Sequence, residues 1–404
     1  MWDIIIVGAG ASGLMCAIEA GKRGRKVLVL DHGDRAGQKI LVSGGGRCNF
    51  TNLYVEPKNY ICANPHFVRS ALSRYTQWDF ISMVDEHKIS WHERDHGQLF
   101  CDGSAREIVK MLLKEAKQAK VTIQLNCKIS GQKKIAGNHF KLSTSSGEYK
   151  CHSLVVATGG LSFPEIGATP FAYEIAKSYE IPLIATRPGL VPLTLHKQQK
   201  KILGELSGIS LLATASCIDK SLQNKAKTAK TVSFTEALLF THRGLSGPVI
   251  LQISNYWQGG RELSLDLLPG KSLLPLLLGN QKDNPKQGLK TVLSQLLPKR
   301  VVEVFLKLAK LESLPLKQYD SKQLQNISDL FHKWQPLVGG TEGYKTAEVT
   351  LGGIDTDYVS PKTMECKSVK GLYFIGEALD VTGWLGGYNF TFAWSSGWAA
   401  GQVA

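Results

Sequence analysis

Three features of the sequence predict an α/β fold whose main part is a Rossmann-like nucleotide-binding domain. The apolar run Ile4–Val7 has the composition of a strand that is buried on both faces. The glycine-rich stretch Gly8-Ala-Gly-Ala-Ser-Gly13 follows it directly, and a second apolar strand, Val27–Leu30, leads into Asp31. This order of strand, glycine turn, helix and strand predicts a βαβ unit that holds a dinucleotide.

Each part of this unit has an expected role. Gly8 would make the tight turn, Gly10 would let the backbone approach a pyrophosphate, and Gly13 would let the helix pack closely on the sheet. The helix is expected over about 11–23, with its N-terminal amides and positive dipole end directed at the phosphates. Asp31 would accept hydrogen bonds from a ribose. The expected cofactor contacts here are Gly8, Gly10, Ala11, Ser12, Gly13 and Asp31.

Apolar periodicity and turn residues predict the elements that follow. A helix is expected over 105–119, and a glycine turn ends the buried strand that begins at Leu154. Other strands are expected over 121–125, 140–144, 149–152, 211–216, 231–234 and 262–266. The leucine-rich stretch 272–333 predicts a compact helical unit, and a closing helix is expected over 386–400.

The order of these elements predicts a discontinuous nucleotide-binding domain. Its first part is expected over 1–189, and its last strand and helix over 336–404. Two inserted units separate the parts: a β-rich, barrel-like unit over 190–270 and a small helical unit over 271–335. The 404-residue length agrees with two or three domains.

Composition narrows the class of protein. A hydrophobic content of 43% is enough for real cores and excludes a disordered chain. The eight cysteines are scattered without a CxxC pair, which predicts reduced thiols and no metal site. Asp3 interrupts any signal peptide, and no apolar run approaches the roughly 20 residues of a membrane helix. We therefore expect a cytoplasmic protein without a membrane partner.

Positive charge is concentrated in the predicted insertion. The chain carries a net charge of +14, and residues 190–335 hold 20 Lys and Arg against 10 Asp and Glu, a net of +10. A basic segment suits an enzyme that acts on nucleic acid, because phosphate neutralisation supplies much of the affinity. The alternative is a lysine-rich surface that serves solubility.

The stretch Lys39–Asn52 contains three consecutive glycines beside polar and charged residues. Glycines let a backbone approach a ligand closely, and the neighbouring side chains suit a pyrophosphate or the polar edge of a flavin. The alternative is a plain flexible loop. The expected cofactor contacts in this stretch are Lys39, Gly45, Arg47 and Asn49.

Two later glycine turns stand where FAD enzymes complete their cofactor site. They are Ala157-Thr-Gly-Gly160 and Ile375-Gly-Glu-Ala-Leu-Asp380. Glu377 would bind the ribityl hydroxyls, or it is a surface carboxylate at a strand end. The glycines before the last helix would direct its dipole at a reduced flavin. The expected contacts are Thr158, Gly159, Gly376, Glu377, Gly387 and Asn389.

These motifs resemble the YhiN/BaiN-like family of bacterial FAD-dependent oxidoreductases over essentially the whole chain. The matching segments are Gly8–Gly13, Ser43–Asn52, Ala157–Gly160, Phe240–Pro248, Val349–Ile354 and Gly371–Asn389. The resemblance implies a Rossmann-like, glutathione-reductase-like FAD-binding domain interrupted by a β-barrel and a helical piece. Asp31 departs from the Glu that many such proteins carry, but Asp also accepts hydrogen bonds from a ribose.

The resemblance further implies reduction of a carbon–carbon double bond. One branch of the family is linked to uridine in ribosomal RNA, giving dihydrouridine, and another to unsaturated bile-acid intermediates. Because the insertion is basic, we expect ribosomal RNA to be the substrate, with NAD(P)H as electron donor. The chain has no second GxGxxG motif, so a nicotinamide donor would bind without its own Rossmann domain.

Two alternatives remain open at this point. The first is an enzyme that reduces a small enone-like metabolite. The second is a flavin-binding RNA or ribosome-assembly protein in which FAD is structural. Tight, salt-sensitive RNA binding without flavin turnover would favour the second.

Reduction of uracil needs a hydride from flavin N5 at one carbon and a proton at the other. The candidates for the proton donor beside glycine motifs are Cys48, His242 and Tyr388. Each has an alternative role. Cys48 would be a thiol packed under the flavin, His242 would fix the insertion to the FAD domain, and Tyr388 would stack near the flavin ring. Arg243 is expected nearer the site, and the expected phosphate contacts are Lys197, Lys200, Lys201, Lys225, Lys227 and Lys230.

Overall fold

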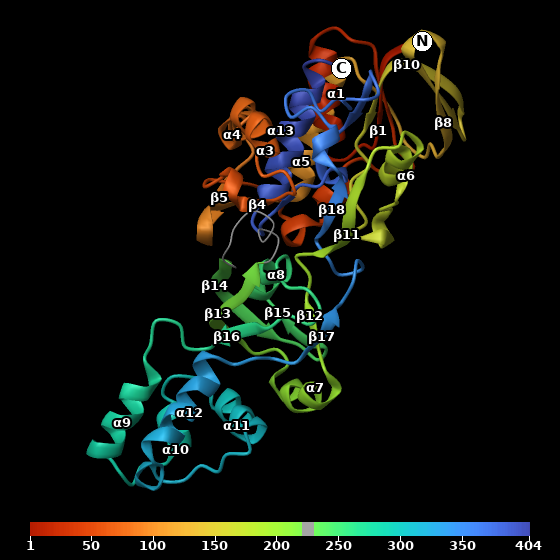
Figure 1. Ribbon diagram of the computed structural model, residues 1–404. Coiled ribbons are helices and arrows are strands. Elements are labelled where there is room, and N and C mark those ends of the chain that lie inside the picture. Colours follow the sequence, from red (N-terminus) through yellow and green to blue (C-terminus); the bar gives the residue numbers. More distant parts are fainter. Residues whose placement is uncertain (220–229) are drawn as a thin grey trace. The chain divides into compact units, whose positions relative to one another are not determined.

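The computed structural model describes residues 1–219 and 230–404, which form two compact units (Figure 1). The first unit combines Met1–Pro188 with Glu348–Ala404, and the second is Gly189–Ala347. The second unit thus extends past 335, where the sequence placed the return to the nucleotide-binding domain. The reason is strand pairing: β17 (Val338–Thr341) pairs with β12 (Leu193–Leu195).

The first unit is built on a mixed sheet that is seven-stranded within the described residues. Parallel pairing joins β7, β2, β1, β10 and β19, while β9 and β8 extend β10 as antiparallel strands. The strands are β1 (Trp2–Val7), β2 (Val27–Leu30), β7 (Thr122–Gln124), β8 (Ile129–Ile135), β9 (His139–Thr144), β10 (Gly147–Val156) and β19 (Leu372–Phe374). Strands β1 and β2 are buried along their lengths from Ile4 and Val27 onward, as their unbroken apolar runs predict.

One strand replaces two that the sequence predicts. The segments 149–152 and 154–157 were expected as separate strands, but β10 runs through both without a turn. Its first half pairs with β9, and its second half enters the parallel sheet beside β1 and β19. The break in apolar character at Ser153 therefore marks a change of neighbours along a continuous strand.

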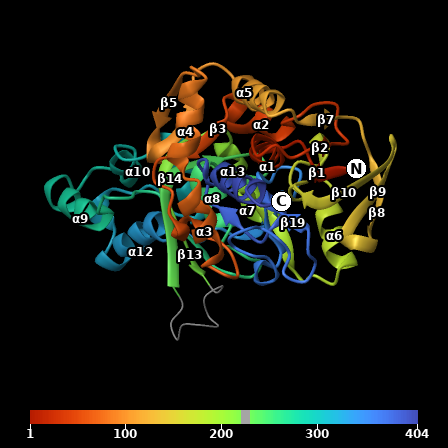
Figure 2. The same cartoon turned by 90° about the horizontal axis from the view of Figure 1, so that it is seen from above.

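Helices and small sheets complete the first unit, and α1, α5 and α13 lie together (Figure 1). The helices are α1 (Ala11–Lys22), α2 (Gln38–Val42), α3 (Phe67–Arg74), α4 (Gln77–Glu86), α5 (Ala105–Gln118), α6 (Phe171–Ser178) and α13 (Tyr388–Gly401). One small sheet has the order β3 (Asn49–Asn52), β6 (Gln98–Cys101), β5 (Trp91–Arg94). A second joins β11 (Leu183–Gly189) to β18 (Val349–Ile354), and a third joins β20 (Thr382–Gly383) to β4 (Tyr60–Ile61). Figure 2 shows α13 from above among the elements of this unit.

Small residues let the C-terminal helix contact the first one directly. A Cβ built on Gly397 would lie 2.4 Å from the carbonyl oxygen of Ser12, and one on Gly401 would lie 2.7 Å from Cβ of Glu19. The two glycines are four residues apart, so they lie on one face of α13. The chain end is thus held against the helix that follows the glycine-rich turn.

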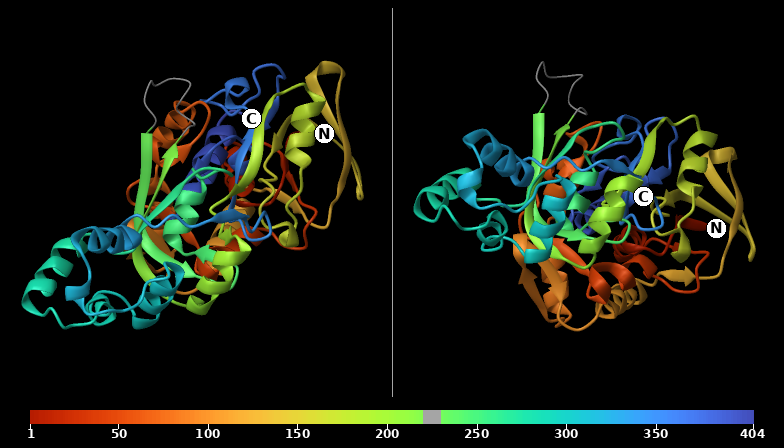
Figure 3. Two further views of the ribbon diagram at one scale, coloured as in Figure 1. Left: turned by 60° about the horizontal axis from the view of Figure 1, so that its bottom comes forward. Right: turned by 90° about the horizontal axis from the view of Figure 1, so that it is seen from below.

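The second unit joins a sheet to a group of helices (Figure 3). Its sheet order is β16-β13-β14-β15-β12-β17, and its longest pair, β13 (Ser210–Asp219) and β14 (Lys230–Phe240), is antiparallel. The other strands are β15 (Gly244–Ser246) and β16 (Leu263–Asp266), and the helices are α7 (Lys197–Leu203), α8 (Pro248–Ser254), α9 (Leu273–Asp283), α10 (Leu289–Leu293), α11 (Lys299–Leu308) and α12 (Ser321–His332). Since β16 and β17 are the two ends of this order, the expected barrel closure is not confirmed.

Three further findings concern the described residues only. All eight cysteines are free thiols. No group of His, Cys, Asp and Glu in the described part of the chain could hold a metal ion. Among the helices of 1–219 and 230–404, none has the length and apolar character needed to cross a membrane.

Candidate cofactor site

The turn between β1 and α1 shows what each of its glycines does. A Cβ built on Gly8 would lie 2.4 Å from the carbonyl oxygen of Ala157, and one on Gly13 would lie 2.0 Å from that of Gly8. A Cβ on Gly10 would meet no described atom within 4 Å, and no side chain caps the start of α1 there. Gly8 and Gly13 therefore permit close packing, whereas Gly10 leaves open space at helix amides that suit a phosphate.

Asp31 connects the end of β2 to this turn. Its Oδ2 accepts a hydrogen bond from the amide of Ala9 at 2.6 Å, and its Oδ1 accepts one from the amide of Gly33 at 2.7 Å. A carboxylate oxygen can accept more than one hydrogen bond, so a ribose hydroxyl can still be added. The ribose contact of Asp31 stays a prediction, and the structure adds a positioning role for the same side chain.

The three consecutive glycines form a left-handed stretch. Gly44, Gly45 and Gly46 have φ values of 55°, 65° and 84°, which other residues rarely adopt. A Cβ on Gly45 would meet no described atom within 4 Å. Arg47 follows with an exposed side chain that has no ion-pair partner among the residues described here. Open backbone beside a free guanidinium is a combination that suits a phosphate.

The next glycine turn lies at the carboxyl end of β10, beside Gly8. The hydroxyl of Thr158 is buried and has no hydrogen-bond partner in the described part of the chain. Gly159 has a φ of 74°, and a Cβ there would meet no described atom within 4 Å. A buried hydroxyl without a partner is costly, so this position suits a hydrogen bond from a ligand, and the cofactor contact of Thr158 stays a prediction.

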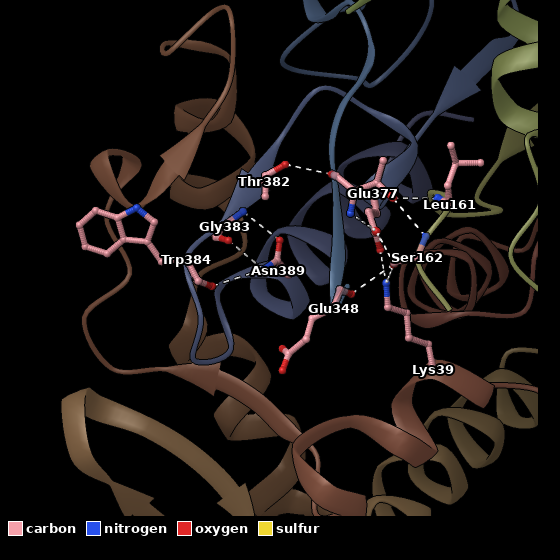
Figure 4. A network of polar contacts seen from close by, with 10 residues as sticks. Lys39, Leu161, Ser162, Glu348, Glu377, Thr382, Gly383, Trp384 and Asn389 are labelled. Carbon is pink, nitrogen blue, oxygen red and sulfur yellow. Dashed lines mark hydrogen bonds and ion pairs between the residues drawn. The ribbon is translucent and has the colours of Figure 1, made fainter. Parts of the chain in front are cut away.

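An ion pair joins the stretch Lys39–Asn52 to the glycine turn Ile375–Asp380 (Figure 4). Nζ of Lys39 lies 2.5 Å from Oε2 of Glu377 and 2.7 Å from Oγ of Ser162. Oε1 of Glu377 accepts the amide of Thr350 at 2.8 Å and lies 3.0 Å from Oγ of Ser162. Both Lys39 and Glu377 were predicted to contact the cofactor, and the structure places them in contact with each other.

Gly160 makes room for this network. A Cβ there would lie 2.4 Å from Oγ1 of Thr350 and 2.9 Å from Oε1 of Glu377. Oγ1 of Thr350 also accepts the amide of Leu161 at 2.7 Å. Gly160 therefore lets β18 approach the turn that contains Glu377. The sequence alone assigned no role to Ser162 or Thr350. The motif Val349–Ile354 contains Thr350 as its only residue with a hydroxyl, and that hydroxyl is the one sign in the sequence of a polar role there.

Glu348 lies beside the network without joining it through its side chain. Oγ of Ser162 lies 3.2 Å from the carbonyl oxygen of Glu348, and the Glu348 carboxyl points elsewhere (Figure 4). Burial raises the pKa of this carboxyl above its ordinary value, and the charge of Lys39 opposes part of that rise. Sequence reasoning did not single out this residue.

The last glycine turns bring three chain segments together. Gly376 has a φ of 66°, its amide donates to Oγ of Ser396 at 3.0 Å, and a Cβ there would lie 2.6 Å from Oγ of Ser12. Gly387 has a φ of 94°, and a Cβ there would lie 2.3 Å from the carbonyl oxygen of Thr51. Both positions therefore require glycine for close packing around the start of α1 and α13.

The two expected asparagines are engaged by the protein. Oδ1 of Asn389 accepts the amide of Gly383 at 2.8 Å, and Nδ2 of Asn389 donates to the carbonyl oxygen of Gly383 at 3.0 Å. The side-chain amide of Asn49 lies 3.3 Å from that of Gln98. Asn389 closes the loop before α13, and a cofactor contact of either side chain stays a prediction.

The three candidates for the proton donor lie in different surroundings. Cys48 is fully buried, and burial raises the pKa of its thiol far above the ordinary value. Tyr388 is buried as the first residue of α13, and its carbonyl oxygen accepts the hydroxyl of Tyr60 at 2.9 Å. His242 belongs to the second unit and is exposed there, between β14 and β15. Cys48 and Tyr388 thus belong to the first unit and His242 to the second, and the role of each stays a prediction.

The expected phosphate contacts belong to the second unit. Lys197, Lys200 and Lys201 are exposed on α7. Arg243 forms an ion pair with Glu342 at 3.1 Å. Lys225 and Lys227 lie outside the described residues, and Lys230 is the first residue of β14.

These observations first define a class: an α/β protein with a Rossmann-type nucleotide site in its first unit. A dinucleotide such as FAD fits the open positions at Gly10, Gly45 and Gly159, together with the Thr158 hydroxyl and the Arg47 guanidinium, which have no partner in 1–219 and 230–404. The chain belongs to the HI0933-like family, because the model of the HI0933-like protein Rossmann domain matches residues 2–403. The family expected from the sequence is thereby confirmed.

Curated relatives match over nearly the full length of the chain. It is 49% identical over 401 residues to the ribosomal RNA dihydrouridine synthase of Escherichia coli strain K12, covering 99% of this chain and 97% of that protein. It is 48% identical over 398 residues to the ribosomal RNA dihydrouridine synthase of Haemophilus influenzae, covering 98% and 96%. It is 25% identical over 411 residues to the 3-dehydro-bile acid delta(4,6)-reductase of Clostridium scindens, covering 99% and 98%.

Proposed function

We propose that this protein is an FAD-dependent oxidoreductase that reduces uridine to dihydrouridine in ribosomal RNA. The observation that carries the proposal is its 49% identity, over 99% of the chain, to the ribosomal RNA dihydrouridine synthase of Escherichia coli. NAD(P)H is the proposed electron donor, and the cytoplasm is the proposed location. The net charge of +10 over residues 190–335 supports an RNA substrate.

The first unit provides the groups that hold the cofactor. The amides at the start of α1 and the guanidinium of Arg47 would bind the pyrophosphate, and Asp31 would accept a ribose hydroxyl. The hydroxyl of Thr158 would gain the partner that it lacks among the described residues. Bound FAD would supply the hydride for the double bond of uracil.

Delivery of the proton requires a group that can reach the substrate. His242 has an exposed side chain, whereas Cys48 and Tyr388 are buried. Among these three candidates, we propose to test His242 first. His242→Gln should keep its FAD and lose at least about 100-fold in rate, the range that a general acid provides. Unchanged turnover would move the role to another residue.

The test is a map of dihydrouridine in ribosomal RNA, by mass spectrometry, from cells with and without the gene. Loss of one dihydrouridine in the deletion strain, restored by the intact gene, is the expected result. Gly10→Glu should fail to restore it, because the new carboxylate would occupy the open space at α1 and repel the pyrophosphate. An unchanged map in a strain that carries the modification would overturn the proposal.

Gly131→Glu is the matched control for Gly10→Glu. Gly131 lies on β8 in the same unit, and a Cβ there also meets no described atom within 4 Å. A gene that carries Gly131→Glu should therefore restore dihydrouridine in the deletion strain. Failure of both variants would indicate a general loss of folding instead of a lost cofactor.

The alternative is reduction of a small unsaturated metabolite. The 25% identity to a bile acid reductase over nearly the whole chain favours keeping it as a second candidate. Rapid NAD(P)H oxidation with an added enone, together with an unchanged dihydrouridine map, would select this function. Salt-sensitive RNA binding without any flavin turnover would select a binding protein with structural FAD.

A further inference from the structure

Two helices of the second unit, α7 and α11, pack against each other and carry exposed positive charge. They are distant in the sequence, and Figure 1 shows them side by side. The cations of this pair are Lys197, Lys200 and Lys201 on α7, and Lys299, Arg300 and Lys307 on α11. We call this set the α7–α11 face.

The apolar residues of α11 determine where its cations lie. Val301, Val302, Val304, Phe305 and Leu306 are buried. Lys299 and Arg300 before them and Lys307 after them are exposed, so the cations lie on the solvent side. From Lys299 to Lys307 the helix rises about 12 Å.

Acidic residues neutralise only part of the α7–α11 face. Lys307 is paired with Glu205 at 2.6 Å, and Glu303 is paired with Lys290 at 2.5 Å. Lys299 and Arg300 have no ion-pair partner within 1–219 and 230–404. The same is true of the three lysines on α7. Five cations thus remain available to an external anion.

The surface is also hollowed at this place. A depression of about 530 Å³ is lined by Glu205, Lys299, Arg300, Glu303, Val304 and Lys307. Its free cations, Lys299 and Arg300, lie at the N-terminal end of α11. A helix N-terminus adds partial positive charge to that of the side chains. A phosphate group fits this chemistry, because guanidinium and ammonium groups both bind phosphate oxygens.

We propose that the α7–α11 face binds the phosphate backbone of the substrate RNA. This inference rests on the proposed function and adds to it a part of the second unit that holds the RNA. The partner is RNA instead of an acidic protein because the apolar residues of α7 and α11 are buried or half-buried, whereas protein interfaces commonly have an apolar centre. Backbone contacts of this kind fix position without reading sequence.

The test compares three variants on ribosomal RNA extracted from cells that lack the gene. Lys197→Gln/Lys200→Gln/Lys201→Gln removes three charges from α7, and Lys299→Gln/Arg300→Gln removes two from α11. The matched control, Lys110→Gln/Lys114→Gln/Lys117→Gln, removes three exposed lysines from one stretch of α5 in the first unit. The measurements are FAD content, thermal unfolding, and the Kd for the RNA at several salt concentrations.

We expect both test variants to keep their FAD and unfold like the wild type. The α7 variant should bind about 10-fold more weakly at 150 mM salt, and its slope of log Kd against log salt should fall by about 2, since each lost phosphate contact removes about 0.7 to 0.9. The control should match the wild type. Wild-type binding by both test variants, or equal weakening by the control, would overturn the inference.

Failure here is distinguishable from failure of the proposed function. If the wild-type protein forms dihydrouridine and the test variants form it equally well, only the role of the α7–α11 face is wrong. If the wild-type protein forms no dihydrouridine in any ribosomal RNA, the proposed function is wrong. An RNA affinity that still depends on the α7–α11 face would then point to the binding-protein alternative.

Discussion

The two units differ in how they would contact a ligand. In the first unit the proposed cofactor contacts depend on backbone, since Gly10 leaves the helix amides open while Gly8 and Gly13 allow the close packing that shapes the turn. In the second unit the proposed RNA contacts depend on exposed side chains such as Lys200 and Arg300. The first kind of contact needs fixed spacing in the sequence, whereas the second needs only charge on a common face.

This difference predicts that the two units respond unequally to substitution. A Cβ in a close backbone contact forces the main chain to move, and the cost is large. An exposed lysine is solvated in both the folded and the unfolded state, so its loss changes stability little. We therefore expect substitutions in the first unit to change folding, and charge removal in the second to change RNA binding instead.

The largest effect should come from Gly13→Ala. Its Cβ would lie 2.0 Å from the carbonyl oxygen of Gly8, and neither backbone can move alone. We expect the free energy of unfolding to fall by at least about 3 kcal/mol, measured by urea denaturation. Gly10→Ala is the control and should change stability by less than about 0.5 kcal/mol. Equal stability of the two variants would contradict the close approach of α1 to β1.

Asp380→Asn should have the next largest effect, and it should depend on pH. Burial raises the pKa of Asp380 to about 6 from 3.8, although the amide of Ala63 donates to it at 2.8 Å. A raised pKa means that its favourable contribution is complete below about pH 4 and is lost as the pH rises through 6. The amide variant keeps an acceptor for Ala63 and never ionises.

Asp380→Asn should therefore raise the free energy of unfolding by about 3 kcal/mol at pH 7.5 and leave it unchanged at pH 4. Thermal unfolding across this range measures the difference. Asp34→Asn, at an exposed position, is the control and should show no such dependence. An equal gain in stability from Asp380→Asn at both pH values would contradict a raised pKa of Asp380.

The Lys39–Glu377 pair should show coupling of intermediate size. Lys39 is about a third exposed, so solvent weakens the attraction, but Ser162 and Thr350 hold the carboxylate in place. Lys39→Met and Glu377→Gln should each cost about 1 to 2 kcal/mol, with the double variant less harmful than the sum by about 1 kcal/mol. Strict additivity in urea denaturation would show that the two side chains act independently.

The smallest effect should come from Lys307→Gln in the second unit. Its pair with Glu205 is about half exposed on both sides, and such pairs contribute little. We expect a change of less than about 0.5 kcal/mol in the free energy of unfolding. A loss above 1 kcal/mol would mean that charge on α11 supports the fold, and the contrast between the two units would then be weaker.

Much of the first unit could be predicted from sequence because its features are local. The turn Gly8–Gly13 and the strands beside it form one continuous segment, and the helix expected over 105–119 is observed as Ala105–Gln118. The boundary near 335 was placed too early, since the pairing of β17 with β12 joins residues about 145 positions apart. No local pattern encodes a partner at that distance.

The sequence by itself determined the family, the fold class and the glycine positions, because each follows from spacing within a short stretch of chain. Only the tertiary structure decided which polar groups pair with which. It placed Lys39 against Glu377, left Thr158 without a partner among the described residues, and packed α7 against α11. These outcomes depend on contacts between distant segments, and a hydrogen bond or an ion pair forms only when folding brings its two atoms within about 3 Å.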